Sequence, residues 1–311
     1  MNIPLRAGLV NVNPASAVHD ARLAEKLGFD LLASGDHVFF RRPVPSAFVQ
    51  LAVAAGATEH IRLVSTIALL PLYPAALLAK LAASLDQASQ GRLELGLGAG
   101  GEFPAEFNAV GVDRSTRFRR MDEGLEVLRL LFTGQSVRFD GEFTTLEDVA
   151  LNPPPSQPGG PPIWLGGRKD RAIRRAGRFA DVWLPYLVTP EMMAGGLAKV
   201  RGAAVDAGRQ AEDVRGAVFA WICVDEDEQW ARRTGIAEVS AAYQQDFQPL
   251  ADRYLVLGSP ASVVRRLSEF ADAGVGTVIM QIAAPPDARA RVVQTIADKI
   301  LPELHAPAHG E

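Results

Sequence analysis

Cysteine is nearly absent from this chain: among its 311 residues only Cys223 occurs. An intrachain disulfide and a cysteine-based metal site are therefore excluded, and Cys223, inside the apolar run VFAWICV (218–224), is predicted to be a buried core thiol. The sequence also lacks an apolar run of about 20 residues, so we expect no membrane span. The N-terminus lacks an apolar segment behind a basic start, which favours a cytoplasmic protein over an exported one.

A strong excess of either charge is missing as well. The formal net charge is −4 and the charged fraction is 22%, which gives no electrostatic reason to expect nucleic acid or a membrane surface as a partner. The arginine-rich run RFRR at 117–120 is interpreted as one face of a helix. The motifs His-x-His, H-E-x-x-H and Gly-x-Ser-x-Gly do not occur. The sequence therefore lacks the motifs that metal-assisted hydrolysis and serine hydrolysis require, and no metal is expected.

What the sequence does contain is a regular alternation of short apolar runs with longer segments of helical spacing. Strands are predicted at 5–10, 29–34, 61–67, 92–97, 162–166, 181–185, 215–224 and 276–282. Helices are predicted at 14–27, 45–57, 74–89, 114–133, 169–179, 189–207, 226–247, 260–273 and 286–300.

Eight strand–helix units with continuous apolar strands imply a parallel sheet covered by helices, and so the α/β class. Eight units in about 300 residues is the count of a (β/α)₈ TIM barrel, predicted here as one domain over 1–311. An insertion after the fourth helix, at about 134–160, contains VRFDGEFTTL, where Asp140-Gly141 marks a hairpin turn. A doubly wound sheet remains the alternative, because periodicity does not prove closure.

The glycine-rich stretch GLGAGG (96–101) matches the spacing G-x-G-x-x-G. A dinucleotide site needs that motif to open a helix directly, with an acidic residue about 20 positions further on. The following EFPAEFNAVGVD contains Pro104, Asn108 and Gly111 and is interpreted as a loop. The stretch is therefore predicted to be a glycine-lined loop at the mouth of a barrel, where a ligand can lie against the backbone.

Two further stretches follow predicted strands. In LGGRKD, Gly166 and Gly167 expose backbone N–H groups, and Arg168 adds a charge beside the start of a helix. Together they form a candidate cradle for a phosphate, with a tight turn that merely requires glycine as the alternative. In SGDHVFF (34–40), Asp36 and His37 form an ionisable pair, with a loop histidine beside a capping aspartate as the alternative.

Taken together, these residues resemble the bacterial luciferase-like monooxygenase superfamily, whose members are (β/α)₈ barrels that use flavin mononucleotide (FMN) or the deazaflavin coenzyme F420. The resemblance runs from about residue 5 to 300. It is carried by GDH, GRLELGLGAGGE, RFRRMDEGLEVLRLLFTGQSVRFDGEF, PPIWLGGRKDRAIRRAGRFADVWLP and GSPASVVRRLSEFADAGVGTVIMQ.

The resemblance implies roles for individual residues. Asp36-His37 is similar to the pair beside the reactive face of the ring in deazaflavin members, whereas flavin members more often carry Glu-His. Ser65, Thr66 and Ile67 match the position of a non-proline cis peptide behind the ring. Gly98, Ala99 and Gly100 match the pocket lining, and Gly166, Gly167 and Arg168 match the phosphate-binding turn. Glu102 stands one glycine later than the proton-donating glutamate of some deazaflavin members, so no strict catalytic role is expected for it.

The expected function is a coenzyme F420-dependent oxidoreductase that transfers hydride between the deazaflavin and a small organic substrate. His37 is expected to move the accompanying proton, with Asp36 orienting it or contacting the ring. The alternative cofactor is FMN, in a monooxygenase that activates oxygen. A nicotinamide-dependent dehydrogenase and a non-catalytic ligand-binding barrel are further alternatives. The resemblance also suggests a homodimer through the apolar helices near the second and third strands.

Overall fold

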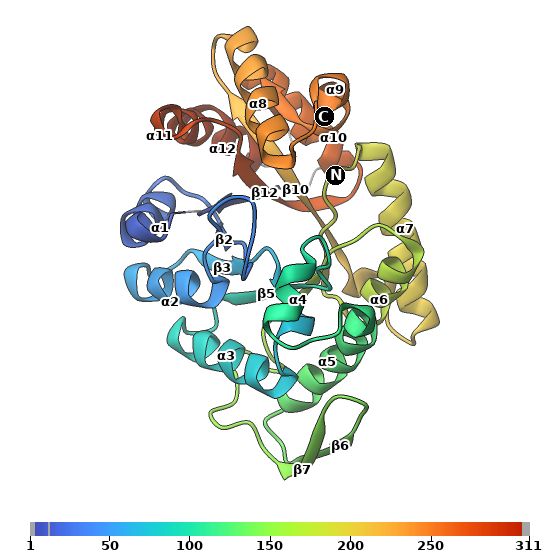
Figure 1. Cartoon of the computed structure of the whole chain (residues 1–311). Coiled ribbons are helices and arrows are strands. Elements are labelled where there is room, and N and C mark those ends of the chain that lie inside the picture. The colour runs from blue at the N-terminus through green and yellow to red at the C-terminus, as the bar shows by residue number, and fades with distance from the viewer. Residues whose placement is uncertain (1–3, 12, 307–311) are drawn as a thin grey trace. The chain divides into compact units, whose positions relative to one another are not determined.

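The computed structural model describes residues 4–11 and 13–306, so the extreme ends of the predicted domain, 1–3 and 307–311, lie outside the described residues. The described elements follow the alternation predicted from the sequence (Figure 1). They divide into two compact units. The first unit comprises the chain up to Val10, Leu23–Leu31 and everything from Gly167 onward; the second comprises 11–22 and 32–166. Helix α1 (Ala17–Lys26) belongs partly to each unit.

The second unit carries the strand order β2-β3-β5-β8, and the short strand β4 also pairs with β5. The pairs β3–β5, β4–β5 and β5–β8 are parallel. The bounds are β2 (Leu31–Ser34), β3 (Arg62–Ser65), β4 (Ala68–Leu69), β5 (Leu93–Gly98) and β8 (Ile163–Leu165). All six residues of β5 are buried, as expected for a strand covered on both faces.

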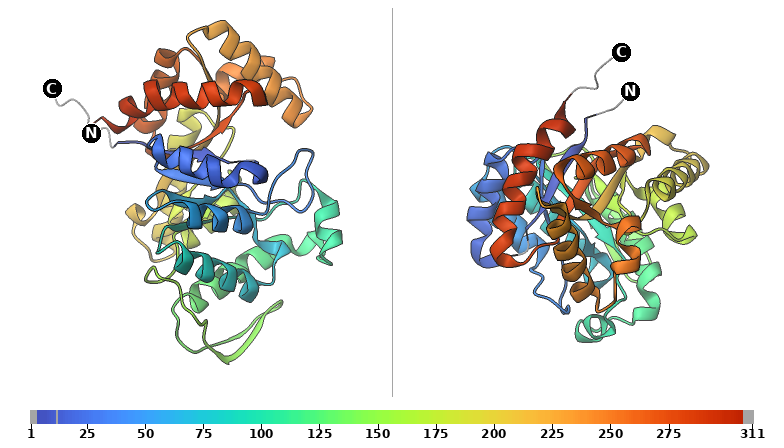
Figure 2. Two further views of the ribbon diagram at one scale, coloured as in Figure 1. Left: turned by 90° about the vertical axis from the view of Figure 1, so that its left-hand side faces the viewer. Right: turned by 90° about the horizontal axis from the view of Figure 1, so that it is seen from above.

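The helices of the second unit follow its strands. They are α2 (Ala47–Ala57), α3 (Ala75–Ala88), α4 (Pro104–Ala109) and α5 (Arg117–Leu131). Figure 2 shows α2 and α3 side by side, and the two helices are in contact. The predicted hairpin is present as β6 (Val137–Asp140) and β7 (Thr145–Val149), which pair antiparallel. Glu123 of α5 fixes its turn by accepting hydrogen bonds from the backbone N–H groups of Glu142 and Phe143.

The first unit carries the strand order β11-β10-β12-β1, and β9 pairs with β10. These pairs are all parallel. The strands are β1 (Arg6–Val10), β9 (Val182–Trp183), β10 (Arg215–Val224), β11 (Val256–Gly258) and β12 (Val275–Ile282). The helices are α6 (Asp170–Phe179), α7 (Pro190–Asp206), α8 (Glu228–Tyr243), α9 (Ala251–Tyr254), α10 (Pro260–Asp272), α11 (Pro286–Thr295) and α12 (Leu301–His305).

The chain has the (β/α)₈ TIM-barrel fold, as the strand–helix count predicts. The barrel strands are β1, β2, β3, β5, β8, β9, β10 and β12, each followed by helical structure. One interpretation was wrong: EFPAEFNAVGVD is not a loop throughout, because Pro104–Ala109 forms α4, with Pro104 at its first position. The short β4, β11 and α9 were not predicted either.

The aromatic and sulfur side chains on strands fill the core. Trp164, Trp183 and Trp221 are all buried, and the indole N–H of Trp164 donates to Glu94 Oε2 at 2.8 Å. Cys223 is also buried, and burial is the main cause that raises the pKa of its thiol to about 12. The thiol therefore stays protonated at neutral pH, as expected of a core cysteine.

Among the described residues, no helix is both long enough and apolar enough to cross a membrane. The same part of the chain holds no group of three or more histidine, cysteine or acidic side chains arranged to bind a metal ion.

Candidate functional site

The histidine after β2 is held by a buried glutamate from α4. His37 Nδ1 lies 3.0 Å from Glu106 Oε1 and 3.2 Å from Oε2. Glu106 Oε1 also accepts hydrogen bonds from the backbone N–H groups of Val38 (2.8 Å) and Phe39 (3.3 Å). The glutamate side chain is 1% exposed and the histidine side chain 22%. A carboxylate at Nδ1 favours the tautomer with its proton there, which leaves Nε2 as the nitrogen that can exchange a proton.

Glu106 is a residue that the sequence reasoning missed. The stretch around it was interpreted as a loop because Pro104, Asn108 and Gly111 lie close together. A usable signal existed: Pro104 suits the first position of a helix, and Glu106 supplies an acidic residue to its first turn. Even so, the pairing of Glu106 with His37 joins residues 69 positions apart, and no local pattern reports such a contact.

The carboxylate of Asp36 accepts hydrogen bonds from residues other than His37. The side chain is buried; Oδ1 accepts from the Ala47 N–H at 3.0 Å and Oδ2 from the Tyr73 hydroxyl at 2.8 Å. Burial raises the pKa of Asp36, opposed by the hydrogen bonds from Ala47 and Tyr73 and by the charge of His37. Burial and the nearby Asp36 carboxylate in turn raise the pKa of Tyr73. Asp36 therefore fixes the loop between β2 and α2, and Glu106 rather than Asp36 orients His37.

The raised pKa of Asp36 has a consequence for stability. Where a carboxyl pKa is higher in the folded than in the unfolded protein, its stabilising contribution is complete below the unfolded pKa and is lost as pH rises through the folded pKa. Asp36→Asn cannot ionise. The unfolding free energy of the wild type minus that of Asp36→Asn should therefore fall as the pH is raised from about 4.

Urea unfolding at a series of pH values measures this difference. Asp113→Asn is a control of opposite sign, because hydrogen bonds from the hydroxyl and the N–H of Ser115 lower the pKa of Asp113. For that pair the difference should instead rise as pH increases from below the usual carboxyl range. A difference for Asp36 that stays flat or rises would show that burial does not dominate its ionisation.

The end of β3 brings three predicted site residues together. The Ser65 hydroxyl donates to Gly96 O at 2.8 Å and accepts from Gly96 N at 2.9 Å. The peptide bond between Thr66 and Ile67 is cis, as the family resemblance implies. Thr66 N donates to Ser34 O at 2.7 Å, whereas Thr66 Oγ1 is buried and has no hydrogen-bond partner within the described chain. A buried hydroxyl of this kind normally has a partner, so Thr66 Oγ1 fits a polar atom of a bound ligand.

The glycines at the end of β5 are required by their own protein neighbours. A Cβ on Gly96 would lie 1.9 Å from Ser65 O, and one on Gly98 would lie 2.1 Å from the Ile67 side chain. Gly100 has a φ of +59° and faces Leu69 and Phe107. Gly96 and Gly98 therefore lie against the Ser65–Ile67 segment, whereas Gly100 lies against Leu69 and Phe107. The sequence suggested that a ligand approaches the backbone closely here. At Gly96 and Gly98 it is instead other residues of the protein that do so.

The turn after β8 has two glycines of different character. Gly167 has a φ of +97°, and a Cβ there would lie 2.7 Å from Ala172 Cβ, so turn geometry alone requires this glycine. Its carbonyl accepts from Trp183 Nε1 at 2.8 Å. Gly166 has no positive φ. Arg168 is exposed, and its guanidinium donates to Leu187 O and lies 5.8 Å from the ring of Tyr186. Lys169, at the N-cap of α6, makes no side-chain capping bond.

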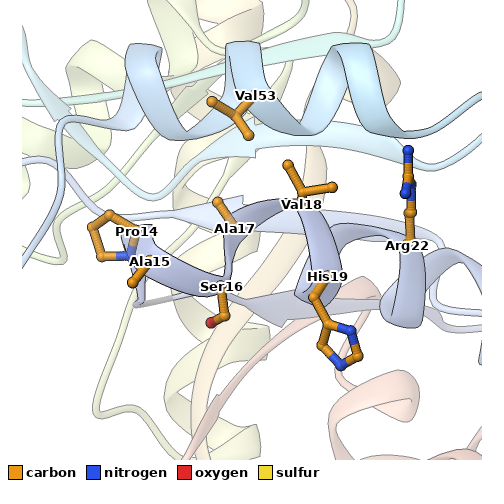
Figure 3. A pocket seen from close by; sticks show the side chains of 8 residues that line it. All are labelled: Pro14, Ala15, Ser16, Ala17, Val18, His19, Arg22 and Val53. Carbon is orange, nitrogen blue, oxygen red and sulfur yellow. The ribbon is translucent and has the colours of Figure 1, made fainter.

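A surface pocket of about 370 Å³ lies between the start of the α1 region and α2. Figure 3 shows Val18 and Arg22 pointing from α1 toward α2, and Val53 pointing back, whereas Ser16 and His19 point to the other side. None of its lining residues is a predicted site residue.

The family model of the luciferase-like monooxygenases matches residues 6–277. The chain belongs to this family. It is therefore an oxidoreductase, and its relatives include an F420-dependent dehydrogenase, a 5,10-methylenetetrahydromethanopterin reductase and a monooxygenase. These relatives are consistent with a flavin-type cofactor and a small-molecule substrate.

Three proteins illustrate what this luciferase-like chain is similar to. An uncharacterised protein of Mycobacterium tuberculosis is 34% identical over 168 residues, which cover 54% of this chain and 57% of that protein. The F420-dependent glucose-6-phosphate dehydrogenase of Nocardia farcinica is 26% identical and is covered over 99% of both chains. The crystal structure of the monooxygenase RslO1 from Streptomyces bottropensis has a TM-score of 0.82 and 26% identity, and covers 96% of this chain and 99% of its own.

Proposed function

We propose that this luciferase-like chain is a coenzyme F420-dependent oxidoreductase that transfers hydride between the deazaflavin and a small organic substrate. The observation that carries the proposal is His37, fixed by the buried Glu106 at Nδ1 and free to exchange a proton at Nε2. The Asp36-His37 dipeptide and the Nocardia relative, whose name includes F420 dependence, support the deazaflavin. The second candidate is a monooxygenase that uses FMN. It is supported by RslO1, which is a monooxygenase at the same 26% identity.

In the proposed site the bound cofactor supplies the hydride chemistry, and the chain supplies binding and proton movement. Thr66 Oγ1 would bind a polar atom of the ring system, with Ser65 and Ile67 forming the wall behind it. Gly98, Ala99 and Gly100 would line the side of that wall. His37 would hold or accept the proton at Nε2 while Glu106 stabilises the imidazolium.

We propose that Gly166, Gly167 and Arg168 bind the cofactor phosphate. This assignment follows from the fold class, since the carboxyl ends of barrel strands share one face and phosphates bind to loops there. The first turn of α6 lacks a side-chain cap, so its N–H groups are available to an anion. Asp170 in the same turn opposes binding, which makes the charge of Arg168 the more important.

Arg168→Ala should weaken cofactor affinity by about 10- to 100-fold, because a hydrogen bond to a charged group contributes roughly 1.5–3 kcal/mol. The kcat at saturating cofactor should change little, since the arginine contacts the phosphate and not the reacting atoms. Arg138→Ala is the matched control: Arg138 lies on the β6–β7 hairpin, is 69% exposed and pairs with Asp148. Unchanged cofactor affinity in Arg168→Ala would refute the phosphate assignment.

Cofactor titration tests the proposed function. The protein contains four tryptophans, so quenching of their fluorescence gives the dissociation constants of F420 and FMN in parallel. We expect F420 to bind at least about tenfold more tightly, a difference of about 1.4 kcal/mol. Tighter binding of FMN, together with oxygen consumption when a flavin reductase is added, would favour the monooxygenase. Binding of F420 without reduction or oxidation by any alcohol, aldehyde or ketone tested would favour a non-catalytic barrel.

We also propose that the protein is a homodimer. The exposed positions of α2 are Val49, Ala52, Val53 and Gly56, and the helix contains no charged residue. Val49 is 66% exposed and Val53 37%, and an uncharged apolar helix face of this kind is typical of a protein–protein interface. Light scattering should give the mass of two chains, and Val49→Glu should give one. A wild-type protein with the mass of one chain would exclude the dimer.

A further inference from the structure

Two phenylalanine rings flank the histidine of the candidate site. Phe40, in the loop after β2, stacks on the His37 imidazole, with 4.3 Å between the ring centroids and 26° between the ring planes. Phe103, directly before α4, meets the same imidazole edge to face at 6.5 Å, and its ring lies 5.0 Å from that of Phe40. The three rings form one contiguous group within the second unit, hereafter the His37 aromatic cluster.

The His37 aromatic cluster presents apolar surface that the protein covers only in part. Phe40 and Phe103 are half-buried, whereas Phe107 of α4 is fully buried. The apolar surface continues along the loop, where Val38 is 48% and Phe39 51% exposed. Aromatic side chains that stay partly uncovered beside a functional histidine are suited to an apolar group of a bound ligand.

The hydrogen bonds of His37 leave one ring nitrogen for that ligand. Within the described part of the chain, His37 hydrogen-bonds only to Glu106, through Nδ1. Nε2 is therefore left for a polar atom of the substrate. A substrate that reaches Nε2 must place its carbon skeleton beside the two phenylalanine rings that flank the imidazole.

We propose that Phe40 and Phe103 determine substrate specificity by binding an apolar group, preferably an aromatic ring, on the carbon that bears the reacting oxygen. The inference rests on the proposed function, in which His37 Nε2 exchanges a proton with that oxygen. A hydrogen bond holds the oxygen about 3 Å from Nε2, so a substituent on the next carbon reaches the neighbouring rings. The substrate class is an alcohol, or the corresponding aldehyde or ketone, with an apolar or aryl substituent.

A purely structural role for the two rings predicts a different result. If the rings only packed the loop, their removal would weaken the binding of all substrates by about the same factor. If they bind the substrate, each methylene group added to it should raise affinity about threefold to fourfold, the effect of burying one CH₂ group. This gain should then depend on the two rings.

The test uses the whole chain with its bound cofactor, F420 or FMN according to the cofactor titration. Dissociation constants of isopropanol, sec-butanol and their next two homologues are measured by ligand-observed NMR, so that the result does not require turnover. Methyl phenyl carbinol and methyl cyclohexyl carbinol compare an aromatic with a saturated ring of similar size. The variants are Phe40→Ser/Phe103→Ser, which removes the apolar surface, and Phe40→Leu/Phe103→Leu, which keeps it without the rings.

Phe143→Ser is the matched control. Phe143 is also half-buried, and the guanidinium of Arg120 lies 4.1 Å from its ring, as that of Arg41 lies 5.5 Å from the ring of Phe103. Phe143 belongs to the turn between β6 and β7 and not to the candidate site. Serine also suits the N-cap of α4, where Phe103 makes no side-chain capping bond, so the helix that carries Glu106 should be retained.

The wild type and Phe143→Ser should show the gain per methylene group and should bind the phenyl carbinol about threefold more tightly than the cyclohexyl one. Phe40→Ser/Phe103→Ser should lose both effects, and Phe40→Leu/Phe103→Leu should lose only the preference for the phenyl ring. A wild type without the gain, or a serine variant that keeps it, would overturn the inference. The gain in affinity without hydride transfer between F420 and any alcohol would support the inference and refute the proposed function.

Discussion

His37→Ala is expected to lower kcat by about 10²- to 10⁴-fold, the contribution of a positioned general acid or base. The cofactor dissociation constant should change little, because the imidazole is assigned to proton movement. The loop between β2 and α2 should keep its conformation in this variant, because Asp36 still accepts hydrogen bonds from Ala47 N and the Tyr73 hydroxyl. Steady-state kinetics with F420 and direct cofactor titration separate the two effects.

Glu106 provides a sharper test of the same couple. Glu106→Gln retains an oxygen that can accept from His37 Nδ1 and from Val38 N, but it removes the negative charge. We expect kcat to fall by roughly 10- to 100-fold, the effect typical of a partner that orients a functional histidine.

Two comparisons keep this prediction specific. Glu106→Ala should be more damaging than Glu106→Gln, because it also leaves the backbone N–H groups of Val38 and Phe39 without their acceptor. Glu102→Gln changes an exposed glutamate of the same loop region and should leave kcat near that of the wild type. Wild-type activity in both His37→Ala and Glu106→Gln would remove the histidine from the reaction.

The sequence predicts the fold well because the barrel repeats one local pattern. Each apolar run with its helical segment is readable by itself, and β10 begins and ends where the run RGAVFAWICV does. The elements that were missed depend on their neighbours instead. The two residues of β4 become a strand only through pairing with β5, and α9 has four residues, too few for a periodic signal.

The candidate site shows the same division. The sequence places Asp36, His37 and the Ser65–Ile67 segment at strand ends, and in the second unit the ends of β2 and β3 are joined by the hydrogen bond from Thr66 N to Ser34 O. It does not reveal that Glu106 is the partner of His37, or that Tyr73 is the partner of Asp36, since both contacts depend on tertiary packing. The reason why position 98 requires glycine also differs. The sequence suggested that a ligand lies against the backbone there, whereas in the structure the side chain of Ile67 occupies the space that a Cβ would need.

Gly96→Ala is expected to destabilise the protein by about 3–5 kcal/mol, the sum of an overpacked core position and lost hydrogen bonds. The added Cβ would lie 1.9 Å from Ser65 O, a backbone atom that cannot rotate away. β3 and β5 would have to separate, which would break both hydrogen bonds between Ser65 and Gly96. Because Ser65 precedes Thr66 and Ile67, the remaining folded protein should also bind cofactor poorly. Thermal unfolding should show a midpoint lowered by about 10 °C.

Two other glycines test whether the backbone contact is the cause. Gly98→Ala would meet the tip of the Ile67 side chain at 2.1 Å, and a side chain can change rotamer, so its cost should be smaller. Gly195→Ala lies on the exposed side of α7 with no heavy atom within 4 Å of the new Cβ. It should raise stability by about 0.5–1 kcal/mol through helix propensity. Equal stability of Gly96→Ala and Gly195→Ala would show that β3 and β5 do not approach each other at Ser65. That result would also refute the proposal that the Ser65–Ile67 segment forms a wall behind the cofactor ring.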